Sequence, residues 1–213
     1  TSHSAIIARS YELPALLGVG DAVHQLAEGQ EIILDAEAGA FFTEFTEADR
    51  IHYEKKREKF LERARKTKLF LDREPVTSDG QRILIEMNIA SSEPQNLEKA
   101  RYSDGVGLFR SEFLYLGHRT LPTEEEQLQT YRKVLMTFGK RPVILRTMDI
   151  GGDKQLDCLD LPKEDNPFLG NRALRLCFTH PDVFRTQLRA ALRASVYGNL
   201  WIMFPMVGSM DDI

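Results

Sequence analysis

The sequence predicts an α/β fold built mainly on parallel strands, and three observations support this prediction. Short, nearly continuous apolar runs alternate with helix-like stretches four times after Gly80. Runs of this kind are typical of strands that are buried on both faces of a parallel sheet. The chain has 213 residues, 42% of them hydrophobic, which is enough to bury a core. A doubly wound sheet and a (β/α)8 barrel both fit this alternation.

The first 45 residues predict half of a small α/β unit. The stretch SAIIARS at 4–10 favours a short helix. Further on, Ile32–Leu34 and Ala40–Phe42 are expected to form two strands that are joined by a tight turn at Gly39.

Residues 46–72 predict one long helix, because strong helix formers fill the segment and it contains no Gly or Pro. Glu62 and Lys66 have the spacing of a stabilising pair on a helix surface. Apolar residues are too few for full burial, so we expect a solvated helix that links two domains, residues 1–45 and 73–213. An ordinary surface helix within one domain is the alternative.

Four strand–helix rounds follow the predicted linker. The expected strands are RILIEMNI at 82–89, GVGLFRSEFLYL at 105–116, PVILRTMDI at 142–150 and LWIMFPMV at 200–207. Helices are expected at 91–103, 122–138, 171–178 and 182–195. Thr123 and Glu126 have capping-box spacing at the start of the second of these helices. If the fold is a barrel, its first and fourth strands need neighbours, so we expect the natural protein to continue at both ends.

Charge and cysteine content exclude several classes of partner. The net charge is −4, with 28 basic and 32 acidic residues interspersed along the chain, so we expect no nucleic acid or anionic membrane as partner. The apolar runs are far shorter than the roughly 20 residues of a membrane helix, so we expect no membrane insertion. Cys158 and Cys177 form no CxxC pair and no secretory signal is present, which predicts a reducing, cytoplasmic setting.

Two arginines end successive apolar runs, Arg110 after GVGLF and Arg146 after PVIL. The carboxyl ends of parallel strands form the rim where active sites lie, so both guanidinium groups are expected at one mouth. Arginine there suits a phosphate or a carboxylate, because its planar fork forms two parallel charge-assisted hydrogen bonds. Alternatively, each arginine pairs with a nearby carboxylate, and Glu112 and Asp149 are close enough in sequence.

His3 is a further candidate for chemistry, because it would lie at the amino end of the helix predicted at 4–10. Free backbone amides and the helix dipole favour an anion at that place. A neutral imidazole there could attack phosphorus. A solvated histidine near a chain end is the alternative.

Several blocks of sequence resemble a known family across essentially the whole chain. They are TSHSAIIARSYELPALLG, DGVGLFRSEFLYL, LPTEEEQ, VILRTMDIGGDK, NPFLGNRALR and IMFPMV. In this order and spacing they resemble Enzyme I of the bacterial phosphoenolpyruvate-dependent sugar phosphotransferase system. The resemblance implies the second half of a swivelling phosphohistidine domain, a long linker helix, and the first four β/α rounds of a (β/α)8 barrel.

The resemblance also implies an activity. In that family the histidine of the TSH block, here His3, accepts the phosphoryl group of phosphoenolpyruvate (PEP) and passes it to the phosphocarrier protein HPr, the first step of sugar uptake. Arg110 and Arg146 match the residues that bind the phosphate and the carboxylate, and Arg172 matches a further contact. Family members bind Mg²⁺ and use a proton-donating cysteine on later strands, so these groups are expected outside this sequence. The fragment alone is therefore expected to be inactive, and the full-length protein is expected to be a homodimer.

Three alternatives stay open. One is a relative such as pyruvate phosphate dikinase or phosphoenolpyruvate synthase, although RTMDIGGDK at 146–154 favours Enzyme I. A second is a nitrogen-regulatory paralogue of Enzyme I. The third is a structural or binding module with a decayed site, against which the presence of His3, Arg110 and Arg146 argues.

Overall fold

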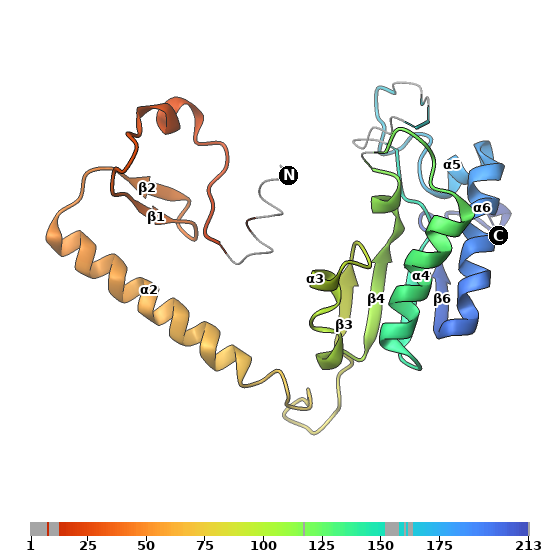
Figure 1. The fold of residues 1–213 in the computed structure, drawn as a ribbon, viewed down its shortest axis with the longest axis horizontal. Helices are drawn as coiled ribbons and strands as arrows, with labels where there is room; N and C mark the ends of the chain where they lie inside the picture. Colours follow the sequence, from red (N-terminus) through yellow and green to blue (C-terminus); the bar gives the residue numbers. More distant parts are fainter. Residues whose placement is uncertain are drawn as a thin grey trace. The chain divides into compact units, whose positions relative to one another are not determined.

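The computed structural model describes residues 8, 13–116, 118–151, 158, 159, 161 and 164–212. The chain divides into two units, Thr1–Arg73 and Glu74–Ile213, and each is described by itself (Figure 1). Apart from Ala8, the helix predicted at 4–10 lies outside the described residues.

The first unit contains a short β-hairpin after a 3-10 turn, η1 (Gly20–Gln25). Its antiparallel strands are β1 (Ile33–Asp35) and β2 (Ala40–Phe42), so the two predicted strands are present and the first is displaced by one residue. Gly39 has φ +71° in the turn between them, a conformation that glycine adopts without a steric penalty.

The long helix of this unit is α2 (Glu47–Lys68), and none of its residues is buried. A capping box starts it: the Asp49 backbone N–H donates to the Thr46 hydroxyl at 3.2 Å, and the Thr46 N–H donates to the Asp49 carboxylate at 2.8 Å. Lys56 Nζ lies 2.6 Å from a carboxylate oxygen of Asp35 and joins the helix to the hairpin. The helix is solvated, as expected, and its role as a linker at 46–72 stays a prediction.

The second unit is built on a four-stranded parallel sheet. Its strands are β3 (Glu86–Ile89), β4 (Gly105–Arg110), β5 (Pro142–Arg146) and β6 (Asn199–Met203), in the order β3-β4-β5-β6. The predicted parallel α/β class is therefore confirmed. The strands are shorter than the apolar runs, and β4 and β5 end at Arg110 and Arg146, where the chain leaves the sheet.

Helices follow each of the first three strands. They are α3 (Pro94–Leu97) and the 3-10 turn η2 (Ala100–Tyr102), then η3 (Ser111–Leu114) and α4 (Glu124–Phe138), then α5 (Leu174–Thr179), α6 (Pro181–Ala194) and the 3-10 turn η4 (Ser195–Tyr197). A last 3-10 turn, η5 (Met210–Asp212), follows β6. The helix expected at 91–103 is thus two separate turns. The capping box of Thr123 and Glu126 is present at the start of α4. None of the helices that the structure describes is long and apolar enough to cross a membrane.

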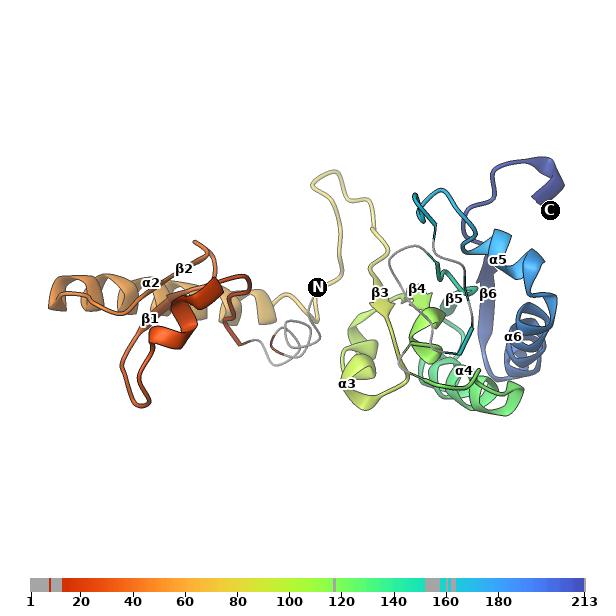
Figure 2. The ribbon, with the colours of Figure 1, turned by 90° about the horizontal axis from the view of Figure 1, so that it is seen from above.

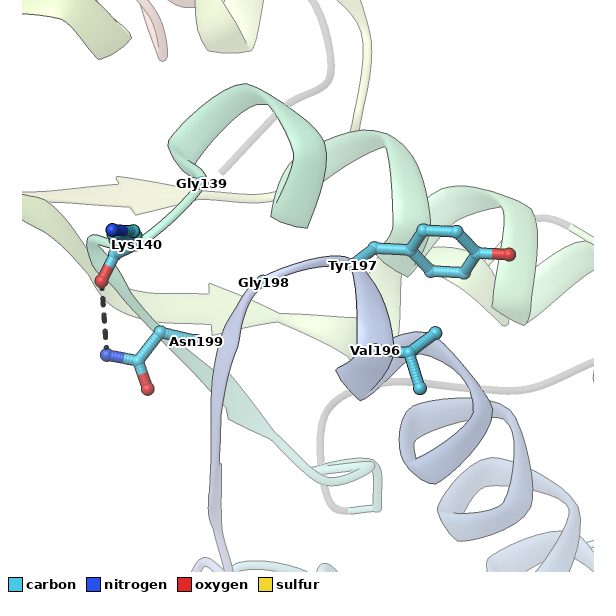
Figure 3. Close-up of a pocket in the computed structure, with 6 residues that line it drawn as sticks. All are labelled: Gly139, Lys140, Val196, Tyr197, Gly198 and Asn199. Atoms are coloured by element: carbon cyan, nitrogen blue, oxygen red, sulfur yellow. Dashed lines mark hydrogen bonds between the residues drawn. The ribbon is translucent and has the colours of Figure 1, made fainter.

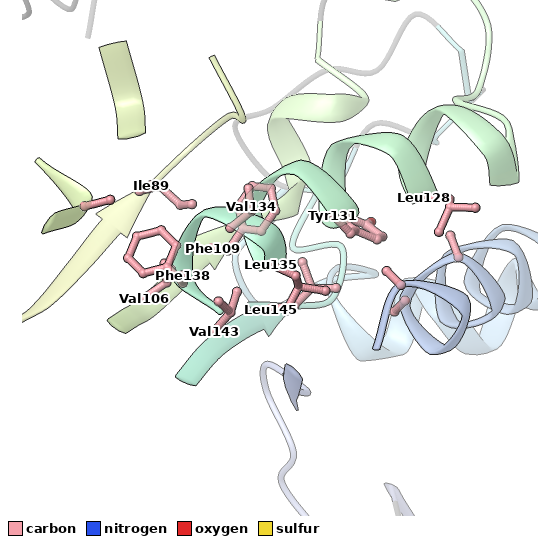
Figure 4. Packing of buried hydrophobic residues seen from close by; sticks show 14 residues of the cluster. Ile89, Val106, Phe109, Leu128, Tyr131, Val134, Leu135, Phe138, Val143 and Leu145 are labelled. Atoms are coloured by element: carbon pink, nitrogen blue, oxygen red, sulfur yellow. The ribbon is translucent and has the colours of Figure 1, made fainter. Parts of the chain in front are cut away.

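The main core lies where α4 and α6 pack side by side on one face of the sheet (Figure 2). Its buried members include Phe109 and Leu145 from the strands and Tyr131 from α4 (Figure 4). The rings of Phe109 and Tyr131 meet edge to face, with their centres 5.9 Å apart. Three small residues of α6, Ala190, Ala191 and Ala194, are fully buried against this cluster. This packing fixes the strands whose carboxyl ends hold the candidate site.

Candidate functional site

Arg110 and Arg146 occupy the same rung of the ladder between β4 and β5. Each is the last residue of its strand, so both lie at the carboxyl edge of the sheet. Parallel α/β proteins bind their ligands at this edge. The structure therefore brings together the two arginines that the sequence predicts at one mouth.

Two carboxylates hold the guanidinium group of Arg146. Its Nη2 lies 2.6 Å from Glu112 Oε1, and its Nη1 lies 3.2 Å from Asp149 Oδ2. The Glu112 side chain is only 1% exposed, so water screens its pair with Arg146 weakly. The pairing that the sequence left open as an alternative is thus present at Arg146, where it fixes the orientation of the side chain.

Asp149 also connects this pair to Arg172, the third predicted residue. Arg172 Nη2 lies 2.8 Å from Asp149 Oδ1, so one carboxylate bridges two guanidinium groups. The backbone supports this contact, because the Ala173 N–H donates to the Ile150 carbonyl at 3.1 Å. A segment that begins 26 residues after the end of β5 is thereby brought to the carboxyl end of that strand.

Arg110 is held by an aromatic ring rather than by a carboxylate. Its guanidinium carbon lies 4.8 Å from the ring centre of Phe113. Among the described residues, Arg110 forms no ion pair, whereas Arg146 and Arg172 do. Arg172 is placed similarly, 5.4 Å from the ring centre of Phe168. Among the described residues, the three guanidinium groups of this cluster face two carboxylates, and this excess of positive charge suits an anion.

Several polar atoms of this cluster have no hydrogen-bond partner among the described residues. They are the Nε atoms of Arg110, Arg146 and Arg172 and the hydroxyl oxygen of Thr147, all buried. A buried polar group without a partner costs about 1–3 kcal/mol, so the cluster can gain stability by binding acceptor oxygens. Thr147 was not predicted from the sequence, although it directly follows Arg146.

The two aromatic partners were also not predicted. Phe113 follows Arg110 by three residues, and Phe168 precedes Arg172 by four. Neither pair lies on a helix, since Arg110 ends β4 and Phe168 and Arg172 precede α5, so helical spacing does not reveal these contacts. Phe168 is 56% exposed, as are several other large apolar side chains of the chain.

Behind the cluster lies a second group of buried side chains: Tyr115, Met148, Ile150, Leu174, Leu176 and Cys177. Burial raises the pKa of the Cys177 thiol to about 12 and holds the pKa of Tyr115 well above its ordinary value. Both groups are therefore neutral at neutral pH, and the charges of the site come from its arginines and carboxylates.

His3 lies outside the described residues, so its role stays a prediction. Within the described ranges, no group of three or more His, Cys, Asp or Glu side chains is placed to hold a metal ion. Cys177 is a buried thiol and Cys158 is half-buried.

A shallow pocket lies at the opposite end of the strands (Figure 3). It has a volume of about 500 Å³ and is lined by Gly139, Lys140, Val196, Tyr197, Gly198 and Asn199. The Asn199 side-chain amide donates to the Lys140 carbonyl across it at 3.3 Å. The pocket adjoins the amino ends of β5 and β6, where parallel α/β proteins do not place their chemistry. We therefore locate the candidate site at the arginine cluster.

Two family models match the chain. The model of the PEP-binding domain of PEP-utilising enzymes matches residues 64–213, and the model of the mobile domain of the same enzymes matches residues 1–39. The three arginines lie within the first match, and His3 lies within the second.

Similar proteins carry a consistent description. The chain is 47% identical over 212 residues to a phosphoenolpyruvate-protein phosphotransferase of Staphylococcus epidermidis. It is 46% identical to the protein of that name from Priestia megaterium and 45% identical to the one from Geobacillus stearothermophilus, each over 212 residues. Each match covers 100% of this chain and 37% of the relative. The chain therefore spans little more than a third of the length of these relatives.

Proposed function

This chain belongs to the family of PEP-utilising enzymes, and from this premise we propose that it forms part of a phosphoenolpyruvate-protein phosphotransferase. The observation that carries the proposal is the shared rung of Arg110 and Arg146, with the net positive charge around it. PEP has a phosphate and a carboxylate close together on a small carbon frame. Adjacent guanidinium groups suit two such anionic groups, because each can form a bidentate contact with oxygen atoms.

The proposed reaction transfers a phosphoryl group from PEP to His3. The imidazole Nε2 forms a bond to phosphorus while the bond from phosphorus to the enol oxygen breaks. That oxygen keeps the electron pair, and enolpyruvate then takes up a proton on carbon to become pyruvate. Phosphohistidine next passes its phosphoryl group to a histidine of HPr, the step that starts sugar uptake.

Within this reaction the arginines bind the substrate and stabilise charge. Phosphoryl transfer proceeds through a loose, in-line transition state, so catalysis consists mostly of positioning and charge neutralisation. Glu112 and Asp149 hold the guanidinium group of Arg146 in place before PEP arrives. Donors that are already oriented need no reorganisation when charge develops on the phosphate oxygens. Arg172 is proposed as the third contact, oriented by Asp149.

Mg²⁺ belongs to the proposal as a cofactor of the complete reaction, where a divalent ion neutralises phosphate charge. The described residues of this chain do not fit such a site, since they include no group of three or more metal-ligating side chains. We assign none of them to the ion, and no step above depends on it.

The sheet order supports a (β/α)8 barrel over a doubly wound sheet. A doubly wound sheet reverses its strand order at a switch point and carries helices on both faces. Here the strands follow sequence order, β3-β4-β5-β6, and α4 and α6 cover the same face. We propose that these are the first four rounds of a barrel, whose interior is the face opposite α4 and α6.

The first unit is proposed to be the second half of a swivelling phosphohistidine domain. Its match to a mobile domain supports this, as does the solvated helix α2 after it. His3 has to reach the arginines and then leave them for HPr, and a helical arm between two rigid bodies permits such a motion. The proposal extends to a cytoplasmic protein that forms a homodimer at full length.

The histidine assignment is tested by incubating the full-length protein with labelled PEP and Mg²⁺. The wild-type protein should acquire acid-labile phosphate, and His3→Ala should acquire none. Labelling of His3→Ala to the wild-type level would refute the assignment.

The arginines are tested by comparing the two directions in which His3 can be phosphorylated. Arg110→Ala or Arg146→Ala should greatly reduce phosphorylation by PEP but spare transfer from phosphorylated HPr to His3. Arg185→Ala is a matched control, because this arginine is exposed and pairs with Asp182 three residues before it on the same helix. Equal losses in both directions would contradict the assignment of Arg110 and Arg146 to PEP.

A further inference from the structure

Gln187 is a fully buried amide on α6 whose hydrogen-bonding groups are all used. Its Oε1 accepts from the Met148 backbone N–H at 2.9 Å. Its Nε2 donates to the Ser111 hydroxyl at 2.9 Å and to the Tyr131 hydroxyl at 3.3 Å. These bonds join a helix on one face of the sheet to two chain segments at its carboxyl edge.

The two segments are those that carry the arginines. Ser111 directly follows Arg110, and Met148 follows Arg146 by two residues. The Ser111 hydroxyl donates in turn to the Arg146 backbone carbonyl at 2.6 Å. One side chain therefore reaches both strand ends, directly at Met148 and through one hydroxyl at Arg146.

These bonds begin where the backbone ladder stops. Arg110 and Arg146 form the last pair of the ladder between β4 and β5, and beyond it the two strands exchange no further backbone bonds of that ladder. Beyond this last pair, hydrogen bonds of the Gln187 amide and the Ser111 hydroxyl connect the two chain segments. Guanidinium groups bind two anionic groups well only at a matching separation, so what connects the two strand ends bears on ligand binding.

The hydrogen bonds continue from Gln187 into the core through Tyr131 and Gln127. The Tyr131 hydroxyl, which accepts from Gln187, donates to Gln127 Oε1 at 3.0 Å, and the Tyr115 hydroxyl donates to the same oxygen at 3.2 Å. Gln127 Nε2 donates to the Pro122 carbonyl at 3.1 Å. Breaking a buried hydrogen bond leaves a polar group without its partner, so a buried network of this kind is costly to disrupt.

We propose that Gln187 is a positioning residue for the anion site, which fixes Arg110 and Arg146 at the separation that PEP requires. The proposal rests on the proposed function and extends it to a residue that touches neither the substrate nor an arginine side chain. An alternative is that Gln187 only stabilises the core, as Gln127 does. The two residues distinguish these cases, because both are buried amides in one network and only Gln187 contacts the strand ends.

The experiment measures KM and kcat for phosphorylation of the full-length protein by PEP in Gln187→Leu, with Gln127→Leu as the matched control. Gln187→Leu should lower kcat/KM by about 10- to 100-fold, mainly through KM, since a small misplacement of binding groups is enough for such a loss. Transfer from phosphorylated HPr to His3 should be unchanged. Gln127→Leu should lose comparable thermal stability and keep its KM for PEP. Equal changes of KM in the two variants would overturn the proposal.

Ser111→Ala provides a second, milder variant in case Gln187→Leu does not fold. It removes the hydroxyl between the amide and the Arg146 carbonyl, and KM for PEP should again rise. An unchanged KM in Ser111→Ala would overturn the proposal. If the wild-type protein takes no phosphoryl group from PEP, the proposed function itself is refuted. If the wild-type protein is active and the variants keep its KM for PEP, only the role of Gln187 is refuted.

Discussion

The carboxylate of Glu112 lies 2.6 Å from the guanidinium group of Arg146, across the junction between β4 and β5. The pair lies within the candidate site, because Glu112 comes two residues after Arg110 and Arg146 ends the next strand. Removing one member of a buried ion pair leaves the other charge uncompensated and typically costs 3–5 kcal/mol. The pair therefore links the stability of the second unit to the geometry of the anion site.

Glu112→Ala should lower the free energy of unfolding by about 3 kcal/mol or more and weaken binding of PEP. Denaturant unfolding and KM measure the two effects. Glu125→Ala is the control, because its ion pair with Arg193 is exposed and should contribute at most about 1 kcal/mol. Equal stability in the two variants would show that the Glu112 pair is as weak as a surface pair.

Acid should weaken the first unit through Asp35. The hydrogen bond from Lys56, together with the Ala38 N–H, holds the pKa of Asp35 below its ordinary value of 3.8. A folded-state pKa below the unfolded value means that the unfolded chain binds the proton more tightly. The stabilisation is thus present above the unfolded value and is lost as pH falls through the folded one. The difference in unfolding free energy between wild type and Asp35→Asn should shrink as pH falls below about 4. A difference that stays constant down to pH 2 would contradict this coupling.

The two thiols should differ in reactivity. The thiolate is the reacting form, and burial raises the pKa of Cys177 to about 12. Cys158 is only partly buried. Iodoacetamide at pH 8 should label Cys158 first in the folded protein and leave Cys177 unlabelled. Mass spectrometry of the digested protein measures the labelling of each thiol. In denaturant both should react at similar rates. Fast labelling of Cys177 without denaturant would mean that its cluster opens readily.

Arg141 should contribute to the stability of the second unit and not to the binding of PEP. Its guanidinium group donates to the backbone carbonyls of Ala100 at 2.5 Å, Ser103 at 2.8 Å and Phe138 at 3.1 Å. Lysine keeps the charge but not the planar fork, so Arg141→Lys leaves carbonyls without donors and should cost about 1–3 kcal/mol. Thermal unfolding measures the loss, KM for PEP should stay unchanged, and Lys140→Ala is the exposed neighbouring control. A raised KM would place Arg141 in the function of the site.

The sequence predicts the parallel sheet well, because alternating apolar runs and amphipathic stretches are regular over the second unit. The capping box at Thr123 and Glu126 is correct for the same reason: it depends on local spacing alone. The helix expected at 91–103 is less accurate. Its residues include Pro94, which begins α3, and α3 ends after one turn at Leu97. Tertiary contacts set the limits of such short segments, and local propensity does not determine them.

The site was predictable to different degrees. Arg110 and Arg146 end successive strands, so their proximity follows from strand order alone. Arg172 comes from a distant segment, and only the family resemblance indicated it. Gln187 was not predicted, although a signal exists: it stands three and four residues before Ala190 and Ala191, on the buried stripe of α6. A polar residue within an apolar stripe is the pattern to examine for buried networks.

Gly151→Ala should disturb the approach of Arg172 to the site. Gly151 has φ +123°, a conformation that side chains rarely adopt. A Cβ atom there would lie 2.5 Å from Arg172 Cβ and 2.9 Å from the Asn171 carbonyl oxygen, so the backbone at 171–172 would have to move. The bridge from Arg172 to Asp149 should then lengthen, which should raise KM for PEP and lower the melting temperature. Gly208→Ala is the matched control, because its Cβ would meet no atom closer than 3.6 Å. A KM for Gly151→Ala equal to that of the control would show that PEP binding tolerates displacement of Arg172 and would argue against its role as a contact.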